Sequence, residues 1–253
     1  GDEVLVVAIS ASGGAARIVE ILEHARELGA RSMLITNNPQ SRGAQAARYV
    51  YNAETPDLCN TPGLRSYFAS MVALAALGSF VGLCRGELPE NQWQEIPGVM
   101  VDCVLSCKPG YEAMDEAMFR LSLRWKDFFR FEIVGDEAEL FSAQFVEQKF
   151  VECASVHCSH VDSEDWCHIN FFLRDPQSVG TVFMVNGAAP DLDRVRESVR
   201  SALEIGRPVL VVPDAPADSF DSRAAVCRMP SPPSGYEWML PLMDFAPGSL
   251  LSA

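Results

Sequence analysis

The sequence has few positive charges and few cysteines for its length. Its 253 residues include 20 Lys and Arg against 34 Asp and Glu, giving a formal net charge of −14. Non-specific nucleic-acid binding needs clustered positive charge, and the basic residues here are scattered, so no nucleic-acid partner is expected. Eight cysteines are too few for a disulfide scaffold of this size, and no Cys-x-x-Cys pair occurs. We therefore expect reduced thiols and a cytoplasmic location.

Targeting and membrane signals are also scarce. No basic, apolar, small-residue leader precedes the first apolar run, which starts at Val4. The run from 66 to 84 is uncharged and, at about 19 residues, borderline for a membrane span. It is rich in Ala and contains Gly78 and Gly82 within an α/β pattern. A buried helix is therefore predicted in place of a span, and no membrane partner is expected.

The first third of the chain alternates strand and helix signals. Residues 4–10 form a nearly continuous apolar run, typical of a strand buried on both faces. Apolar positions from 18 to 28 recur at helical spacing and end at Gly29. Further strand signals follow at 31–37 and 49–53, with a short helix between them. This rhythm predicts a parallel, doubly wound sheet.

The remaining chain reads as a helical connector and a second α/β unit. Helical patterns fill residues 63–128, interrupted by Pro and Gly. The α/β rhythm then resumes, so the fold class is α/β with two tandem doubly wound subdomains, predicted at 1–126 and 127–253. Strands are expected at 129–135, 181–186, 208–214 and 224–228, and helices at 136–153 and 191–205.

A small-residue turn joins the first strand to the first helix. It consists of Ser10-Ala11-Ser12-Gly13-Gly14. Unpaired N–H groups at a helix N-terminus favour anions, so this turn can hold a phosphate. Because Ser is also a common helix cap, ordinary capping is an equally open interpretation at this point.

The order of these elements resembles the sugar isomerase (SIS) domain family, whose members bind phosphosugars. The resemblance covers roughly residues 4–214 and implies two flavodoxin-like SIS subdomains. It implies phosphate or sugar binding by Ser10, Ala11, Ser12, Gly13 and Thr61, with Thr36 and Ser41 nearby. Gly14 and Ala15 stand where the family has an acidic residue and Thr. It also implies that a family N-terminal strand and C-terminal tail are absent.

A second motif resembles the tandem-SIS isomerases that include the isomerase half of glucosamine 6-phosphate synthase, and the fructosamine phosphate deglycases. Lys149 and Glu152 match a Lys-x-x-Glu pair, and the segment ending at His168 matches a downstream Gly-Glu-Leu-Lys-His segment. Trp166 and Cys167 replace its Leu and Lys. The resemblance implies a homodimer whose histidine segment can come from the neighbouring subunit.

The expected chemistry is proton transfer between C1 and C2 of a phosphorylated sugar or sugar amine, without metal or organic cofactor. Glu152 is the candidate acid and base for isomerisation or deglycation. His168 is the candidate proton shuttle at the ring oxygen, and Lys149 the group that keeps Glu152 ionised or stabilises an oxyanion. A Lys and Glu three residues apart also form many plain surface ion pairs.

Two other interpretations stay open. The chain can be a phosphosugar-binding sensor without turnover, since the first loop and the segment before His168 depart from the family. A zinc site is the third hypothesis, although zinc ligands usually come in closer pairs. The acidic residues before His168 either form a charged face or orient the imidazole. The zinc candidates are Cys153, His157, Cys158, His160, Cys167 and His168.

Overall fold

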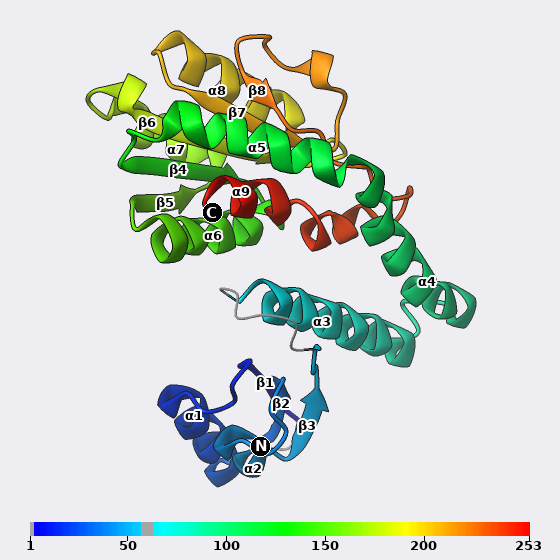
Figure 1. Cartoon of the computed structure of the whole chain (residues 1–253). Helices are drawn as coiled ribbons and strands as arrows, with labels where there is room; N and C mark the ends of the chain where they lie inside the picture. Colours follow the sequence, from blue (N-terminus) through cyan, green and yellow to red (C-terminus); the bar gives the residue numbers. More distant parts are fainter. Residues whose placement is uncertain (1–2, 57–62) are drawn as a thin grey trace. The chain divides into compact units, whose positions relative to one another are not determined.

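The protein is described by a computed structural model that covers residues 3–56 and 63–253. These residues fall into two compact units, 1–95 and 96–253, and each unit is described by itself (Figure 1). Helix α4 (Glu90–Ser106) crosses the division between them. Two parallel sheets, one in each unit, confirm the predicted α/β class and the tandem arrangement.

The first unit is built on a parallel sheet in the order β1-β2-β3. Residue 7 of β1 lies beside residue 33 of β2, and residue 35 beside residue 51 of β3. Helix α1 packs against β1 and β2. The elements are β1 (Leu5–Ile9), α1 (Ala16–Glu27), β2 (Arg31–Thr36), α2 (Arg42–Ala46), β3 (Tyr49–Asn52) and α3 (Leu64–Arg85).

Helix α1 follows the predicted apolar spacing. Val19, Leu22 and Ala25 are buried along one face, where they meet Leu34 of the central strand β2. The helix stops before Gly29, whose φ of +69° favours glycine. The sequence pattern thus accounts for both the buried face and the end of this helix.

Helix α3 is apolar as predicted, but the expected burial is wrong. Only Ala73 of its 22 residues is fully buried, and Phe80 is half exposed. By length and composition alone this helix is long enough to cross a membrane, a test that core helices of soluble proteins also pass. Its apolar surface is instead available for contact with other protein surface.

The second unit contains a five-stranded parallel sheet in the order β5-β4-β6-β7-β8. Strand β5 pairs with one side of β4, and the later strands β6, β7 and β8 continue from the other side of β4. The direction in which strands are added therefore reverses between β4 and β6. The elements are α4 (Glu90–Ser106), α5 (Tyr111–Trp125), β4 (Arg130–Gly135), α6 (Glu139–Lys149), β5 (His157–Val161), α7 (Ser163–His168), β6 (Val179–Val185), α8 (Leu192–Glu204), β7 (Val209–Pro213), β8 (Ala225–Val226) and α9 (Phe245–Leu251).

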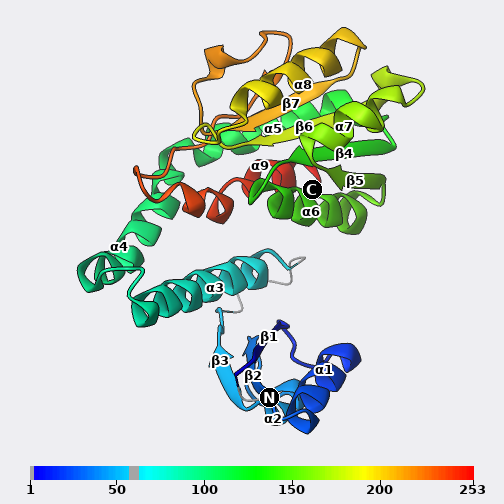
Figure 2. The ribbon, with the colours of Figure 1, turned by 180° about the vertical axis from the view of Figure 1, so that it is seen from behind.

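Helices cover both faces of this sheet (Figures 1 and 2). Consecutive strand residues point to opposite faces. The ring of Phe131 in β4 lies 4.5 Å from that of Phe150, which follows α6, whereas Glu132 accepts a hydrogen bond from Trp166 in α7. Helix α9 packs on α5 and α6, and α7 packs on α8. Helices α5, α6 and α9 therefore lie on one face, with α7 and α8 on the other.

Two details differ from the sequence-based expectation. Residues 157–161 form β5, a strand that was not predicted because its histidines and cysteines dominated the interpretation of this segment. The helix expected over 136–153 divides into α6 and a π-helical turn, Phe150–Ala154. Helix α5, which was assigned to the first subdomain, packs within the second unit. The predicted subdomain boundary between residues 126 and 127 stays a prediction.

Candidate functional site

The loop between β1 and α1 is held by its own serines. The backbone N–H of Gly13 donates to Ser10 Oγ at 3.2 Å, and that of Gly14 donates to Ser12 Oγ at 3.3 Å. A hydroxyl that accepts in this way still has its own hydrogen to donate. Ala11, Ser12 and Gly14 are exposed. The loop therefore presents hydroxyl and backbone groups to solvent in a fixed conformation.

The loop before α1 is held by hydrogen bonds and a close contact against the end of β2 and the loop that follows it. Gly13 has φ +62°, and a Cβ there would lie 2.0 Å from Ser41 Oγ. Thr36 Oγ1 donates to the carbonyl of Ala11 at 3.1 Å, and the N–H of Gly43 donates to the carbonyl of Gly13 at 2.9 Å. The predicted residues Thr36 and Ser41 thus lie against the predicted loop. Ser41 also caps α2 through the N–H of Ala44.

Helix α1 begins at this loop without a side-chain cap. Its N-cap position is occupied by Ala15, which has no side-chain oxygen to cap the first N–H groups. Ser10 and Ser12 are engaged with the loop's own backbone, so ordinary capping does not explain them. Thr61, the other predicted sugar-binding residue, lies outside the described residues.

Lys149 and Glu152 form an ion pair at the end of α6. Lys149 Nζ lies 2.5 Å from Glu152 Oε2 and 4.8 Å from the centre of the Phe145 ring. The lysine side chain is only 5% exposed, while that of Glu152 is 52% exposed. Holding an ammonium group out of water has a free-energy cost that a plain surface pair does not carry. The lysine is thus fixed, and the carboxylate remains accessible.

His168 ends α7 and is exposed. Its Nε2 lies 3.0 Å from Glu164 Oε1, and Arg194 Nε lies 3.6 Å from the other oxygen of Glu164. Of the acidic residues before the histidine, Glu164 therefore orients the imidazole, and Asp162 caps α7. Because α6 and α7 cover opposite faces of the sheet, the His168 helix lies across the sheet from Glu152 within one chain.

Most histidines and cysteines of the zinc hypothesis have other surroundings. His160 Nδ1 is bonded to Glu147 of α6, a pair that the sequence did not reveal. Cys158 is buried, and burial raises the pKa of its thiol. Within residues 3–56 and 63–253, no group of three or more His, Cys, Asp or Glu side chains is placed to hold a metal ion.

Buried carboxyl groups at the carboxyl end of the second sheet were not identified from the sequence. Burial raises the pKa of Glu139 to about 7 and also raises the pKa of Asp214. The pKa of Asp244 is well above its ordinary value, first because of burial and then because of the charges of Glu139 and Asp214. Their separation along the chain gave no signal that they meet.

A second cluster of buried polar side chains links three elements of this unit. Arg207 Nη1 lies 2.8 Å from Glu132 Oε2, and Trp166 Nε1 donates to the same oxygen at 2.9 Å. Burial lowers the pKa of Arg207, and the Glu132 charge opposes that shift. The charged Glu132 within an otherwise apolar strand was the available sequence signal. The cluster joins β4, α7 and the turn before β7.

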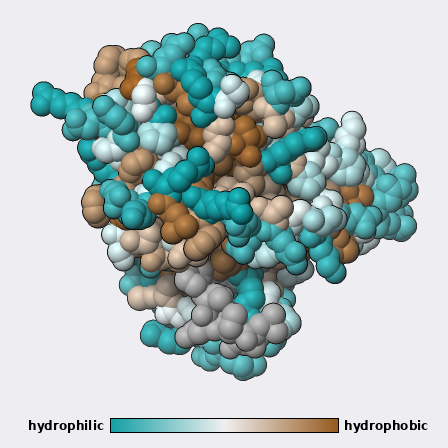
Figure 3. Space-filling view, turned by 45° about the horizontal axis from the view of Figure 1, so that its top comes forward, coloured by the Kyte–Doolittle hydropathy of each residue, from teal (hydrophilic) through white to brown (hydrophobic). Residues whose placement is uncertain are grey.

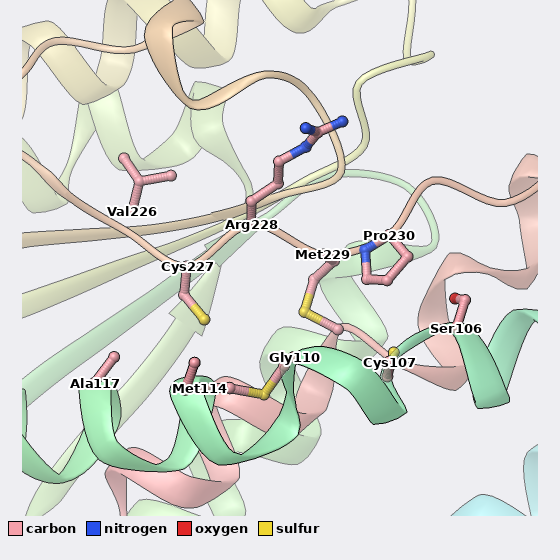
Figure 4. Close-up of a pocket in the computed structure, with 11 residues that line it drawn as sticks. Ser106, Cys107, Gly110, Met114, Ala117, Val226, Cys227, Arg228, Met229 and Pro230 are labelled. Carbon is pink, nitrogen blue, oxygen red and sulfur yellow. The ribbon is translucent and has the colours of Figure 1, made fainter.

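A pocket of about 570 Å³ lies between the start of α5 and the strand region around β8. In Figure 4 the sulfur atoms of Met114, Cys227 and Met229 point into it, while the guanidinium of Arg228 points away. Burial raises the pKa of Cys227 to about 11, so its thiol is protonated at neutral pH. This pocket is apolar and does not offer a charged group to a phosphate.

Comparisons with known proteins agree with this description. The domain model called SIS domain matches residues 1–80. No curated protein matches the sequence. Among solved structures, the C-terminal domain of glucosamine-fructose-6-phosphate aminotransferase from Francisella tularensis has a TM-score of 0.85 at 19% identity, covering 100% of this chain and 70% of that one.

Two further structures share the fold. Tagatose-6-phosphate ketose/aldose isomerase from Escherichia coli has a TM-score of 0.73 at 13% identity, covering 98% of this chain and 67% of that one. Glucosamine-6-phosphate deaminase from Thermotoga maritima has a TM-score of 0.63 at 12% identity, covering 98% and 68%. These likenesses show that the chain has the tandem α/β fold of those structures. The match to the SIS domain model is confined to residues 1–80.

Proposed function

We propose that the protein binds a phosphorylated sugar or sugar amine and catalyses proton transfer between C1 and C2. The observation that carries the catalytic part is the burial of Lys149 beside an accessible Glu152. The ion pair with Lys149 holds the Glu152 carboxylate in place, where it can accept a proton from the sugar. The SIS match and the fixed loop before α1 support phosphosugar binding.

In the proposed isomerisation, Glu152 takes the proton from C2 of the open-chain aldose and returns it to C1 of the enediol. The hydroxyl proton moves from O2 to O1, giving the ketose. Lys149 holds the carboxylate, and His168 transfers the ring-opening proton. For a fructosamine phosphate, the same proton transfer in the reverse direction precedes addition of water and release of the amine.

A panel of hexose, hexosamine and fructosamine phosphates tests this proposal. We expect at least one of these compounds to raise the melting temperature of the protein. When that compound is incubated with the protein in D₂O, NMR should detect deuterium at C1 or C2. Glu152→Gln should abolish deuterium incorporation and leave the thermal shift. Asp221→Asn, at a carboxyl paired with Arg223 away from these residues, is the matched control. Incorporation unchanged in Glu152→Gln would exclude the proposed base.

Binding without turnover is the second candidate function. Ala15 at the start of α1 and Cys167 before His168 favour it, because both positions lack the polar group of the family motifs. In that case a sugar phosphate would raise the melting temperature of the wild type, Ser12→Ala would lose the shift, and no deuterium would enter the sugar. Ser122→Ala, at a partly exposed hydroxyl on α5, is the control.

We also propose that the protein is a homodimer in the cytoplasm. Ile169 and Phe172, which follow His168, are 65% and 74% exposed, and α3 adds further apolar surface. Figure 3 shows brown apolar patches among the hydrophilic surface. Such surface is typical of protein interfaces. A partner subunit would place its own His168 segment against Glu152, which the sheet separates from His168 within one chain.

A further inference from the structure

Helix α9 lies on the face of α6 that ends at Lys149. Ser142 Oγ donates to Asp244 Oδ1 at 2.8 Å. One turn along α6, the ring of Phe145 meets that of Phe245 edge-on at 5.6 Å. One turn further, Lys149 Nζ lies 4.8 Å from the Phe145 ring. The α6 residues in these contacts are spaced by three and four, so they form one stripe of the helix.

The backbone of α9 packs directly against a side chain of α6. A Cβ on Gly248 of α9 would lie 2.5 Å from Val146 Cγ1. Asp244 is 1% exposed and Ser142 is completely buried. The other carboxyl oxygen of Asp244, Oδ2, is buried and has no hydrogen-bond partner. Hydrogen bonds from the Ser142 hydroxyl and the Phe245 backbone N–H are poor compensation for a fully buried charge, which favours the neutral carboxyl group here.

We propose that α9 is a proton-dependent latch on α6, in which neutral Asp244 is the positioning residue for the Lys149–Glu152 pair. With the carboxyl protonated, α9 holds Phe245 against Phe145, and Phe145 holds Lys149 beside Glu152. When Asp244 ionises, its charge faces Glu139 of α6 and Asp214 after β7, and α9 loosens. The α5 side of α9 offers no compensation, since its buried residues are apolar: Met114, Met118, Leu121 and Trp125.

The direction of the pH effect follows from the raised pKa of Asp244. Burial is the first cause, and the charges of Glu139 and Asp214 raise the pKa further. A carboxyl whose folded-state pKa is raised stabilises the docked form at low pH, and this contribution is lost as pH rises through the folded pKa. The pKa of the facing Glu139 is about 7, so its charge develops in the same direction near neutrality.

Hydrogen exchange and lysine labelling of the full chain test the latch. Between pH 6 and pH 8, protection of residues 245–252, corrected for intrinsic exchange, should fall roughly tenfold in the wild type. Reductive methylation of Lys149, followed by mass spectrometry, should accelerate relative to an exposed lysine over the same range. Asp244→Asn, which stays neutral and still accepts from Ser142, should suppress both changes. Asp115→Asn, at an exposed position on α5, should behave as wild type.

The positioning role rests on the proposed function, whereas the latch itself is measured without turnover. If a substrate is found, kcat should fall with rising pH in the wild type and change less in Asp244→Asn, with KM little altered. Equal pH dependence of α9 exchange in the wild type and Asp244→Asn would overturn the latch. If Asp244→Asn suppresses the pH dependence of exchange in α9 but leaves the pH dependence of Lys149 labelling unchanged, the coupling of α9 to the ion pair is overturned. Absence of turnover would count only against the proposed enzyme.

Discussion

At the scale of single residues, the candidate phosphate loop depends on one glycine. Gly13 combines a left-handed backbone with direct contact to Ser41, whose hydroxyl caps α2. A residue with a Cβ would be strained in this backbone conformation and would clash with Ser41. The neighbouring Gly14 has an ordinary backbone, and a Cβ there would meet nothing closer than Ser12 Oγ at 3.9 Å.

Gly13→Ala should therefore destabilise the protein, whereas Gly14→Ala should not. The left-handed conformation alone has a cost of roughly 1–3 kcal/mol for a non-glycine residue, and the clash with Ser41 adds to it. Gly14→Ala is the matched control and should change stability by about 0.5 kcal/mol or less. Urea unfolding measures both, and equal destabilisation would contradict the role of the loop contact.

The buried Glu132–Arg207 pair supports a second prediction at this scale. Arg207→Met leaves the Glu132 charge buried with only Trp166 as a donor, so unfolding free energy should fall by about 3–5 kcal/mol. Adding Glu132→Leu should recover much of that loss, because the buried charge is then removed. Denaturant unfolding of both variants gives the comparison, and a double variant weaker than Arg207→Met would count against this account.

At the scale of elements, the carboxyl end of the second sheet makes stability depend on pH. Glu139, at the start of α6, is 4% exposed and accepts from Asn186 Nδ2 at 3.4 Å after β6. Because burial raises its pKa to about 7, the folded state favours the protonated form. This contribution to stability is present below the ordinary glutamate pKa and is lost as pH rises through about 7.

Glu139→Gln should flatten this dependence. Between pH 4.5 and pH 7, its unfolding free energy should increase relative to that of the wild type by up to about 3 kcal/mol, since the amide has no proton to lose. Denaturant unfolding at several pH values measures the difference. Glu137→Gln, the preceding carboxylate, controls for a change of net charge, and parallel curves for all three proteins would exclude the effect.

Element periodicity explains how much of the fold was predictable. Apolar or mostly apolar runs predicted the strands β1, β4, β6 and β7, and helical spacing predicted α1 and α8, because a buried face leaves a local pattern. The expectation that residues 4–10 are buried on both faces is wrong, since Leu5 and Ile9 of β1 are 44% and 38% exposed. Strand β5 was missed because it lies at the edge of the sheet and pairs only with β4. Its residues, including His157 and His160, are largely polar and form no apolar run. The family resemblance, and not the local pattern, singled out Lys149 and Glu152, and neither indicated that the lysine is buried.

Contacts between distant residues left no such signal. Asp244 meets Ser142 across 102 positions, and Arg207 meets Glu132 across 75. Apart from Glu132, which stands in a mostly apolar strand, each of these residues looks like an ordinary polar residue in its own segment. Their pairing is created by the strand order and by the docking of helices, which a single sequence does not specify. The two candidate clusters missed by sequence reasoning are both of this kind.

At the scale of the whole molecule, the proposed dimer can be tested by mixing inactive variants. If Glu152 and His168 of one site come from different subunits, a heterodimer of Glu152→Gln and His168→Ala contains one intact site. Random mixing should then restore roughly a quarter of wild-type turnover. Mixed variants that stay inactive, although sedimentation shows subunit exchange, would place both residues of a site in the same chain.

Strands β1 and β3 form the two borders of the first sheet in the part of the chain that the structure describes. Along β3, Tyr49, Val50 and Tyr51 are all exposed, so this edge strand presents large apolar side chains. Such an edge recruits further strands and seeds fibrils. Residues 1–95 expressed alone should thus polymerise and bind thioflavin, and Val50→Lys should keep them monomeric.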